Sequence, residues 1–390
     1  MGRRYQVISG DGHLETAPDL WLQHVPERWR DRAPRLVRLP DGGDGWIVEG
    51  RPLLQTGQNL TGRGPVKWKA VSYHREDGTP AEGAGGAVQR LREQDIDGID
   101  AEVLFPPVLA TRFIEGISDR EAYLAINRAY NTFLAEDLCS VAPDRLIGTA
   151  ALPVSGVDDA IAELERVHGL GLRSVTLHQF PNGSGSPTPE DDRFWERLLE
   201  LGMPMSAHSN FGARSAADTN MANATNLADQ PFVAAMNQHT SGIVPIFCLT
   251  QLFASGVFDR FPELQIYFAE VNVAYLPAAL YYLDRDYRVY NEWFNVELKM
   301  KPSEYILEHA WFGAIQEHLA LRMGEFFPLD RLMFGTDFPH SVGTYPDTPT
   351  YIKEAFGHLD EATQRKILVE NPARFYGLDP DADITETPAE

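Results

Sequence analysis

Short apolar runs alternate with amphipathic segments along most of this chain. Each run has the length of a buried strand, and most are followed by apolar residues at helical spacing. This alternation predicts parallel strands joined by helices, because the chain must cross back before the next parallel strand begins. The predicted strands are Tyr5–Ser9, Ala101–Phe105, Leu146–Leu152, Ser174–Leu177, Pro204–Ala207, Gln265–Ala269, Ala310–Ala314 and Arg331–Gly335.

Helical patterns occupy most intervals between these runs. They cover about 87–96, 119–138, 157–168, 191–201, 232–258, 275–290, 349–356 and 361–369.

One interval breaks the alternation. Residues 18–85 are rich in Gly and Pro, with a hairpin-like pattern only around Trp46–Leu54. An ordinary connection is much shorter than this, so the segment predicts an insertion or a lid after the first strand. Residues 380–390 form a polar tail that we expect to be mobile.

Polar residues at the strand ends distinguish two architectures. They end the first, fourth, fifth, sixth and eighth predicted strands. A doubly wound sheet would place its site at one switch point, whereas a closed barrel brings every strand end to one mouth. The distribution predicts a (β/α)₈ TIM barrel, as a single domain over 1–379 that includes the insertion. The 390 residues permit this, since barrels take about 250 residues and can exceed 400.

The composition is that of a globular protein, with 43% hydrophobic and 23% charged residues. A net charge of −22 argues against a nucleic-acid partner, because neutralising phosphates requires clustered Lys and Arg. No apolar signal region follows the basic start, and no stretch approaches a membrane span. We therefore expect a cytoplasmic protein with a small-molecule substrate. Cys139 and Cys248 lie in apolar segments, where we expect buried thiols without a disulfide.

Asp11 and His13 are candidate metal ligands. Alternate residues of a strand point to the same side, so the two side chains converge while Gly12 turns away. A carboxylate oxygen beside an imidazole nitrogen makes half of a site for a divalent cation. The triplet is also typical of an ordinary turn.

His208 and Asp337 each end an apolar run, at the fifth and eighth predicted strands. A histidine there can also be a satisfied core residue, and an aspartate can cap the next helix. A buried carboxylate without a cation or hydrogen-bond donors is costly, which favours a functional Asp337. If the barrel forms, both residues meet Asp11 and His13 at one mouth.

Further polar residues fall at or after the strand ends, where solvation or core packing is the competing interpretation. The candidates for proton transfer are His178, His239 and His340, and those for substrate binding are Arg112, Arg214 and Asn210.

Several motifs resemble amidohydrolase family 2, which includes aminocarboxymuconate semialdehyde decarboxylase and the resorcylate decarboxylases. They occur in order along nearly the whole chain. They are Asp11-Gly12-His13 with Glu15 and Pro18–Trp21, then Asp95–Pro106, Ala207-His208, Gly256–Pro262, Phe334–His340 and Glu370–Leu378.

The resemblance implies a homodimer and one divalent metal ion, zinc or manganese, with Asp11, His13, His208 and Asp337 as ligands by position. Family members often carry histidine where this chain has Asp11. An added oxygen ligand favours a harder ion such as manganese without excluding zinc.

A second departure concerns Glu270, at the end of the sixth predicted strand. In the decarboxylases this strand ends in a histidine that acts as acid or base. A carboxylate can also move protons if burial or the metal tunes its pKa. Alternatively, Glu270 orients a metal ligand.

Glu270 leads us to prefer metal-dependent hydrolysis of an amide, lactone or cyclic substrate. The metal would lower the pKa of bound water, Asp337 would accept its proton, and His178 or Glu270 would protonate the leaving group. The alternative is non-oxidative decarboxylation of an aromatic or unsaturated carboxylic acid. A minor alternative is an inactive barrel that only binds ligands.

Overall fold

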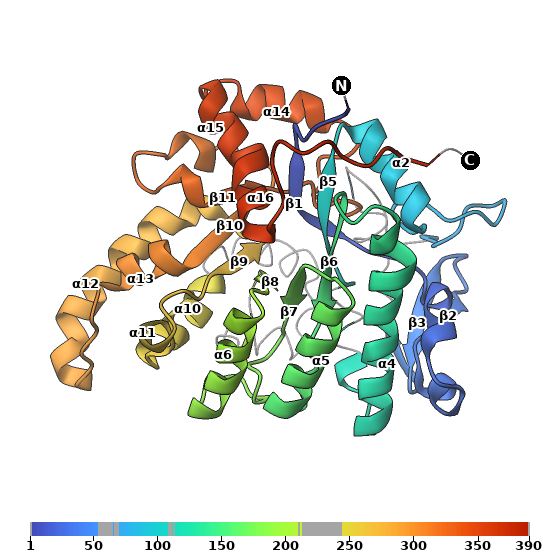
Figure 1. Ribbon diagram of the computed structural model, residues 1–390, viewed down its shortest axis with the longest axis horizontal. Helices are drawn as coiled ribbons and strands as arrows, with labels where there is room; N and C mark the ends of the chain where they lie inside the picture. The colour runs from blue at the N-terminus through green and yellow to red at the C-terminus, as the bar shows by residue number, and fades with distance from the viewer. Residues whose placement is uncertain are drawn as a thin grey trace.

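Eight parallel strands run in chain order around a nearly closed barrel in the computed structural model of the protein (Figure 1). The structure describes residues 2–53, 65, 70–107, 111, 114–209, 211–212 and 244–388. The TIM-barrel prediction is confirmed, and the predicted strand Ala310–Ala314 is one of its eight strands. The barrel strands are β1 (Ile8–His13), β5 (Ala101–Phe105), β6 (Leu146–Ala151), β7 (Ser174–Thr176), β8 (Met205–His208), β9 (Ile266–Ala269), β10 (Ala310–Ala314) and β11 (Leu332–Phe334).

The barrel closes where the segment after β11 returns to β1. The amide of Asp337 donates to the carbonyl of Asp11 at 2.9 Å, and the amide of His13 donates to the carbonyl of Phe338 at 2.7 Å. These bonds lie beyond the end of β11, at the carboxyl ends of the strands. Closure therefore brings Asp11, His13 and Asp337 together through the backbone itself.

Helices cover the outside of the barrel (Figure 1). The pattern at 119–138 corresponds to α4 and a π-helical turn, Leu134–Leu138. The α-helices are α2 (Ala87–Asp97), α4 (Arg120–Phe133), α5 (Val157–Gly169), α6 (Asp192–Glu200), α10 (Val244–Ala254), α11 (Val257–Arg260), α12 (Leu276–Phe294), α13 (Pro302–His309), α14 (Thr348–Phe356), α15 (Glu361–Arg365) and α16 (Asn371–Tyr376).

One helix prediction is wrong in its extent. The pattern at 232–258 predicts a continuous helix, but α10 ends at Ala254 and α11 begins at Val257. Gly256 between them has φ +73°, a left-handed conformation that ends a helix and that glycine adopts readily. Residues 232–243 lie outside the described part of the chain.

The insertion between β1 and α2 carries its own antiparallel sheet. The predicted hairpin is formed by β3 (Asp44–Val48) and β4 (Arg51–Leu53), and an additional strand, β2 (Arg35–Arg38), pairs with β3. Trp46 of β3 is 2% exposed, so this sheet has a buried face. The sheet lies beside α4 at the edge of the barrel (Figure 1).

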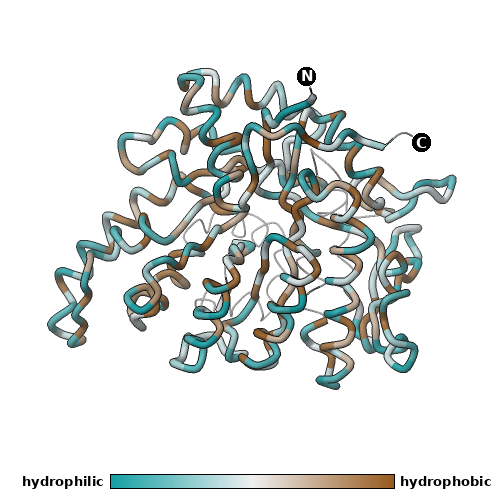
Figure 2. Tube along the Cα trace, in the orientation of Figure 1, coloured by the Kyte–Doolittle hydropathy of each residue, from teal (hydrophilic) through white to brown (hydrophobic). Residues whose placement is uncertain are grey.

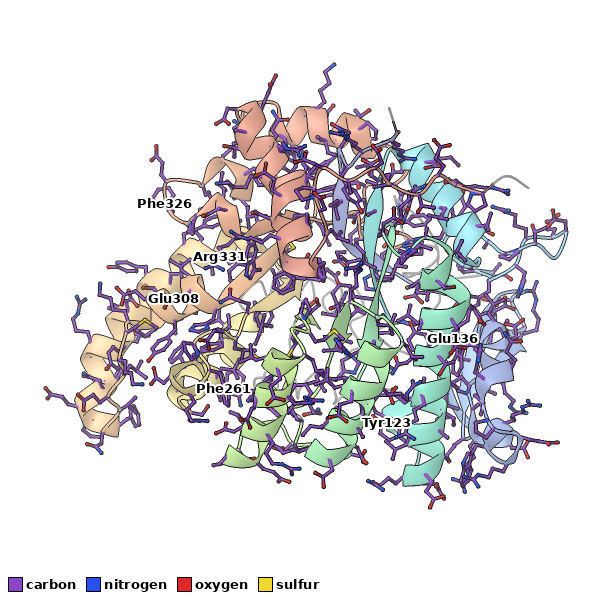
Figure 3. All side chains as sticks on the ribbon, in the orientation of Figure 1. Tyr123, Glu136, Phe261, Glu308, Phe326 and Arg331 are labelled. Atoms are coloured by element: carbon purple, nitrogen blue, oxygen red, sulfur yellow. The ribbon has the colours of Figure 1, made fainter. Side chains whose placement is uncertain are left out.

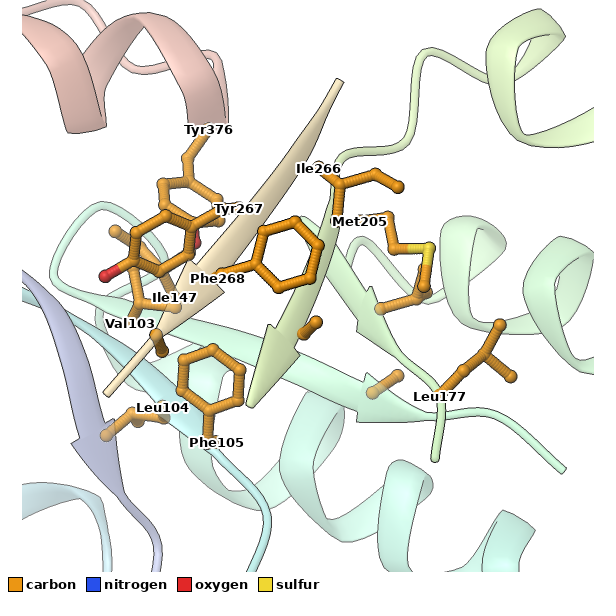
Figure 4. Packing of buried hydrophobic residues seen from close by; sticks show 14 of the residues in the cluster. Val103, Leu104, Phe105, Ile147, Leu177, Met205, Ile266, Tyr267, Phe268 and Tyr376 are labelled. Carbon is orange, nitrogen blue, oxygen red and sulfur yellow. The ribbon is translucent and has the colours of Figure 1, made fainter. Parts of the chain in front are cut away.

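The barrel interior is filled by side chains from facing strands. Tyr267 and Phe268 of β9 point to opposite sides of the strand (Figure 4). The Tyr267 hydroxyl reaches across to β1 and β10, where a Cβ on Gly10 or Gly313 would lie only 2.8 or 2.5 Å from it. These two glycines leave the space that the tyrosine occupies.

Hydrophobic and hydrophilic positions alternate along the outer helices, as expected where one helix face packs on the barrel (Figure 2). Within the described residues, none of the helices combines the length and the apolar character needed to span a bilayer. Cys139 and Cys248 are buried free thiols, as predicted.

The polar tail is attached as far as residue 388, contrary to the expected mobility. The amide of Ile384 donates to the carbonyl of Arg3 at 2.9 Å, and that of Thr385 donates to Asp144 Oδ2 at 2.6 Å. Ile384 is also buried. A single apolar residue and these backbone bonds hold the tail beside the N-terminus (Figure 1).

Candidate metal centre

Four predicted ligands meet at the carboxyl ends of β1, β8 and β11. His13 Nε2 lies 3.0 Å from His208 Nε2, 3.1 Å from Asp337 Oδ1 and 3.6 Å from Asp11 Oδ1. All four side chains are less than a tenth exposed. Donor atoms from three strands, far apart in sequence, thus share one small buried volume.

Backbone conformation at the strand ends aims these groups at the mouth. Ser209, Glu270 and Asp337 follow β8, β9 and β11 and have φ of +59°, +50° and +54°. Residues other than glycine rarely adopt this left-handed region, and such strain concentrates at functional sites. At each of these residues the chain leaves the strand direction, and the turn places a polar side chain near the mouth of the barrel.

The donor set fits a divalent cation. Neither oxygen of Asp11 has a hydrogen-bond partner among the described residues, although the side chain is completely buried. Burial, followed by the charge of Asp337, raises the pKa of Asp11. Burial lowers the pKa of His13 and of His208, which favours the neutral imidazoles that bind metals. Two imidazoles and two carboxylates suit zinc or manganese.

His340 lies against the same centre and contacts Asp337, Glu15 and His13. Its Nδ1 lies 3.0 Å from Asp337 Oδ1, its Nε2 lies 3.2 Å from Glu15 Oε1, and its ring stacks on His13 with 3.8 Å between centroids. Burial opposes protonation, but Asp337 and Glu15 outweigh it and raise the pKa of His340 well above its usual value. Against the same burial, His340 and His13 hold the pKa of Asp337 low.

Glu270 lies beside His208, with 3.2 Å between Oε2 and Nε2. Burial and then the charge of Asp337 raise the pKa of Glu270 to about 8. The side chain is still 23% exposed, so it is accessible from the mouth while it contacts a predicted ligand. This position is compatible with both roles considered from the sequence.

His178 is paired with a residue that the sequence did not reveal. Its Nδ1 lies 2.6 Å from Glu115 Oε1. Burial lowers the pKa of His178, but Glu115 more than compensates and raises it. No local pattern marks Glu115, because its partner is 63 positions away in the chain.

A buried ion pair supports the first and last strands of the site. Arg90 Nε donates to Glu102 Oε2 at 2.7 Å, and Arg90 Nη2 donates to the carbonyl of Phe338 at 3.1 Å. A Cβ on Gly12 would lie 2.0 Å from Glu102 Oε1, so only glycine leaves room for this carboxylate between Asp11 and His13. The sequence signal for this ion pair was Glu102, a charged residue inside the apolar run at 101–105.

Four further predictions lie outside the described residues: His239, Arg112, Arg214 and Asn210. Their roles stay predictions. Asp337 does not cap the following helix, since α14 begins only at Thr348.

The family model described as Amidohydrolase matches residues 66–378. Gamma-resorcylate decarboxylase of Rhodococcus jostii is 26% identical over 309 residues, covering 74% of this chain and 87% of that protein.

Solved structures share the fold at low identity. An amidohydrolase of Mycobacterium avium subsp. paratuberculosis matches with TM-score 0.71 and 18% identity, over 96% of this chain and 98% of that one. A dihydroxybenzoic acid decarboxylase of a Polaromonas species matches with TM-score 0.63 and 21% identity, over 97% of each chain. The latter structure contains manganese and the inhibitor 2-nitroresorcinol.

Proposed function

This chain is an enzyme of the amidohydrolase family, and on that premise we propose that it catalyses metal-dependent, non-oxidative decarboxylation of an aromatic or unsaturated carboxylic acid. The observation that carries the proposal is the meeting of Asp11, His13, His208 and Asp337 at the mouth. The decarboxylases among the relatives favour this alternative over hydrolysis, which the sequence alone led us to prefer.

Asp11, His13, His208 and Asp337 would hold the divalent cation. When bound, such an ion polarises an anionic substrate oxygen and holds it in place. The oxygen of Asp11 and the manganese in the Polaromonas structure support manganese, with zinc as the other candidate.

Glu270 is the proposed proton donor in this reaction. The bond between the substrate carbon and its carboxylate breaks, CO₂ leaves, and the electron pair stays on the carbon. The Glu270 carboxyl then gives its proton to that carbon and regains one from solvent. Its contact with His208 and its exposure toward the mouth support this role. His340, held between Asp337 and Glu15, adds positive charge beside the bound anion.

Release of CO₂ tests the reaction. Protein loaded with manganese or zinc should release CO₂ from members of a panel of hydroxylated aromatic acids. A chelator should abolish the release and added metal should restore it. Cleavage of amides or lactones with ¹⁸O from water entering a new carboxylate, without CO₂, would contradict the proposal and favour hydrolysis.

Glu270→Gln separates the two roles of that residue. Loss of the proton donor should reduce turnover by about 10²–10⁴-fold while metal content stays normal. Glu297→Gln, at an exposed position after α12, is the matched control and should retain full turnover. If Glu270→Gln instead binds metal weakly but turns over normally at saturating metal, Glu270 only orients His208.

The homodimer and the cytoplasmic location also belong to this proposal. Tyr281, Trp293 and Phe294 of α12 are 67%, 83% and 67% exposed, and extensive apolar surface of this kind often marks a protein contact. Light scattering of the purified protein should give the mass of two chains. A mass of one chain at micromolar concentration would exclude a stable dimer.

A further inference from the structure

A cavity lies at the opposite end of the barrel from the metal centre. It has a volume of about 500 Å³. Pro204, Gln265 and Arg331 on its wall each directly precede a strand, β8, β9 and β11 respectively, so the cavity opens at the amino ends of the strands. This end of a TIM barrel normally serves stability, and the proposed reaction uses no residue there.

Two arginines and one tryptophan dominate its polar wall. The guanidinium carbons of Arg331 and Arg374 lie 4.9 and 4.5 Å from the ring centre of Trp311. Among the described residues, neither guanidinium forms an ion pair with a carboxylate. Burial and the charge of Arg374 lower the pKa of Arg331, and they outweigh the charges of Asp330 and Glu308, which favour its charged form. Arg374 itself is exposed to solvent.

Gln265 fixes this arrangement before any ligand arrives. Its Nε2 donates to the carbonyl of Glu308 at 2.9 Å, which determines the orientation of the amide. Its Oε1 therefore accepts from Trp311 Nε1 at 2.9 Å and from Arg331 Nη1 at 2.8 Å. Figure 3 labels both Arg331 and Glu308. A preorganised donor group loses little entropy on binding.

The remaining wall is mainly apolar, with Leu198, Met203, Leu264 and Phe375. A ring can pack on such side chains, and a planar guanidinium matches the two oxygens of a carboxylate. Glu263 lies on the same wall as the two arginines, so the charged groups of the cavity carry a net positive charge although the whole chain carries −22.

We propose that this cavity is a binding site remote from the metal centre, which takes a small aromatic carboxylate with its ring against the apolar wall that includes Met203 and Phe375, and its carboxylate toward Arg331 and Arg374. The site is independent of the metal centre, and its existence does not depend on the proposed reaction.

Crystals of the metal-loaded protein soaked with 4-iodobenzoate test the location. Anomalous scattering should place iodine in this cavity, whether or not a second molecule occupies the mouth. Iodine found only at the mouth, or nowhere, overturns the proposal.

Titration with 4-fluorobenzoate, followed by fluorine NMR, tests the charges. Arg374→Gln should weaken binding to this site about tenfold or more, because a hydrogen bond between charged groups is lost. Turnover should not change. Arg365→Gln removes a partly exposed arginine of α15 that is paired with Glu370 and Asp381, so it is the control away from the cavity and should bind as the wild type does.

Glu263→Gln removes a negative charge from an exposed residue of the cavity wall, so its effect on binding should be opposite to that of Arg374→Gln. Removing this negative charge should tighten binding, and the exposed position makes misfolding an improbable cause of any effect. Unchanged or weaker binding in Glu263→Gln, together with unchanged binding in Arg374→Gln, contradicts the proposal. Binding of inorganic phosphate without any binding of fluorobenzoate contradicts the aromatic carboxylate as ligand.

Discussion

Asp11 and Asp337 show how strongly neighbours determine the chemistry of a single side chain. Both carboxylates are completely buried at the same centre. Asp337 contacts His13 and His340, which hold its pKa low. The carboxylate oxygens of both residues lack a hydrogen-bond partner of good geometry among the described residues, but Asp11 Oδ1 lies farther from His13, at 3.6 Å, and burial raises the pKa of Asp11. Asp337 is therefore stabilised as an anion by the protein, whereas Asp11 requires a cation that the protein must bind.

This difference predicts an unusual effect of Asp11→Asn. Asp11→Asn removes a buried acid group whose ionised form the metal-free protein does not stabilise, so it should raise the thermal midpoint of that protein. The same change should weaken metal binding by at least about tenfold, since even losing a partner of a ligand has this effect. Calorimetric unfolding and metal titration measure the two quantities. Asp19→Asn, at an exposed position nearby, should alter neither. An Asp11→Asn protein that binds metal normally would remove Asp11 from the ligand set.

At the scale of elements, α2 connects the start of the barrel to the segment that completes the site. Arg90 donates to the carbonyl of Phe338, directly after Asp337. Asp97, the last residue of α2, accepts from the amide of Thr348 at 3.0 Å and from its hydroxyl at 2.6 Å. Asp97 thereby caps α14 from another helix. One helix thus holds both ends of the chain segment between Asp337 and α14.

The pH dependence of stability should reveal the burial of Asp97, which outweighs the two hydrogen bonds from Thr348 that favour its ionised form. Burial raises the pKa of Asp97 in the folded protein from 3.8 to about 6. Stabilisation by Asp97 is therefore complete below the unfolded pKa and is lost as the pH rises through about 6. Between about pH 4.5 and 7.5, the wild type should lose about 2 kcal/mol of unfolding free energy relative to Asp97→Asn. Urea unfolding of both proteins measures this difference.

Asp360 provides the matched control for that experiment. It accepts from the amide and the hydroxyl of Thr363, the same two donors, but it is exposed at the start of α15. Those hydrogen bonds lower its pKa. Because the pKa of Asp360 in the folded protein lies below its unfolded value of 3.8, its contribution to stability is lost only as the pH falls through that lower pKa and is nearly constant above about pH 4.5. Asp360→Asn should therefore show the same pH dependence as the wild type between about pH 4.5 and 7.5. If Asp360→Asn and Asp97→Asn differ from the wild type in the same way over this interval, burial of Asp97 is not the cause of its pH dependence.

At the scale of the whole molecule, the metal centre lies at the seam of the barrel. Asp11 and His13 end β1, Asp337 follows β11, and the closing backbone bonds join these same residues. His208, the last residue of β8, contributes the fourth predicted ligand from the other side of the mouth. A cation bound by all four would therefore connect three strands, including both strands at the seam.

Metal binding should stabilise the entire fold. A ligand that binds only the folded state at about a thousand times its Kd adds about 4 kcal/mol to the unfolding free energy. Chelation should lower the thermal midpoint, and manganese or zinc should restore it. His208→Ala should show no response to either treatment. A wild-type midpoint that is indifferent to chelator and metal would mean that these residues do not bind a structural or catalytic ion under those conditions.

Local patterns in the sequence were sufficient for the elements and for the main part of the candidate site. The apolar runs predicted the barrel strands, because strands buried on both faces carry continuous apolar residues. The same reasoning missed α13 and β2, which are only 8 and 4 residues long, although α13 buries Pro302, Tyr305, Ile306 and His309 at helical spacing. It joined α10 and α11 because a glycine within an apolar stretch does not reveal its φ.

The sequence by itself determined which residues end the strands, and hence that Asp11, His13, His208 and Asp337 would meet if the strands closed into a barrel. Strand periodicity and parallel order are properties of neighbouring residues, which a sequence displays directly. Only the tertiary structure decided which side chains share contacts: Glu115 with His178, Glu15 with His340, and Arg90 with Glu102. Those pairs, and the pKa values that they set, depend on distances between residues remote in the chain and on the water that folding excludes.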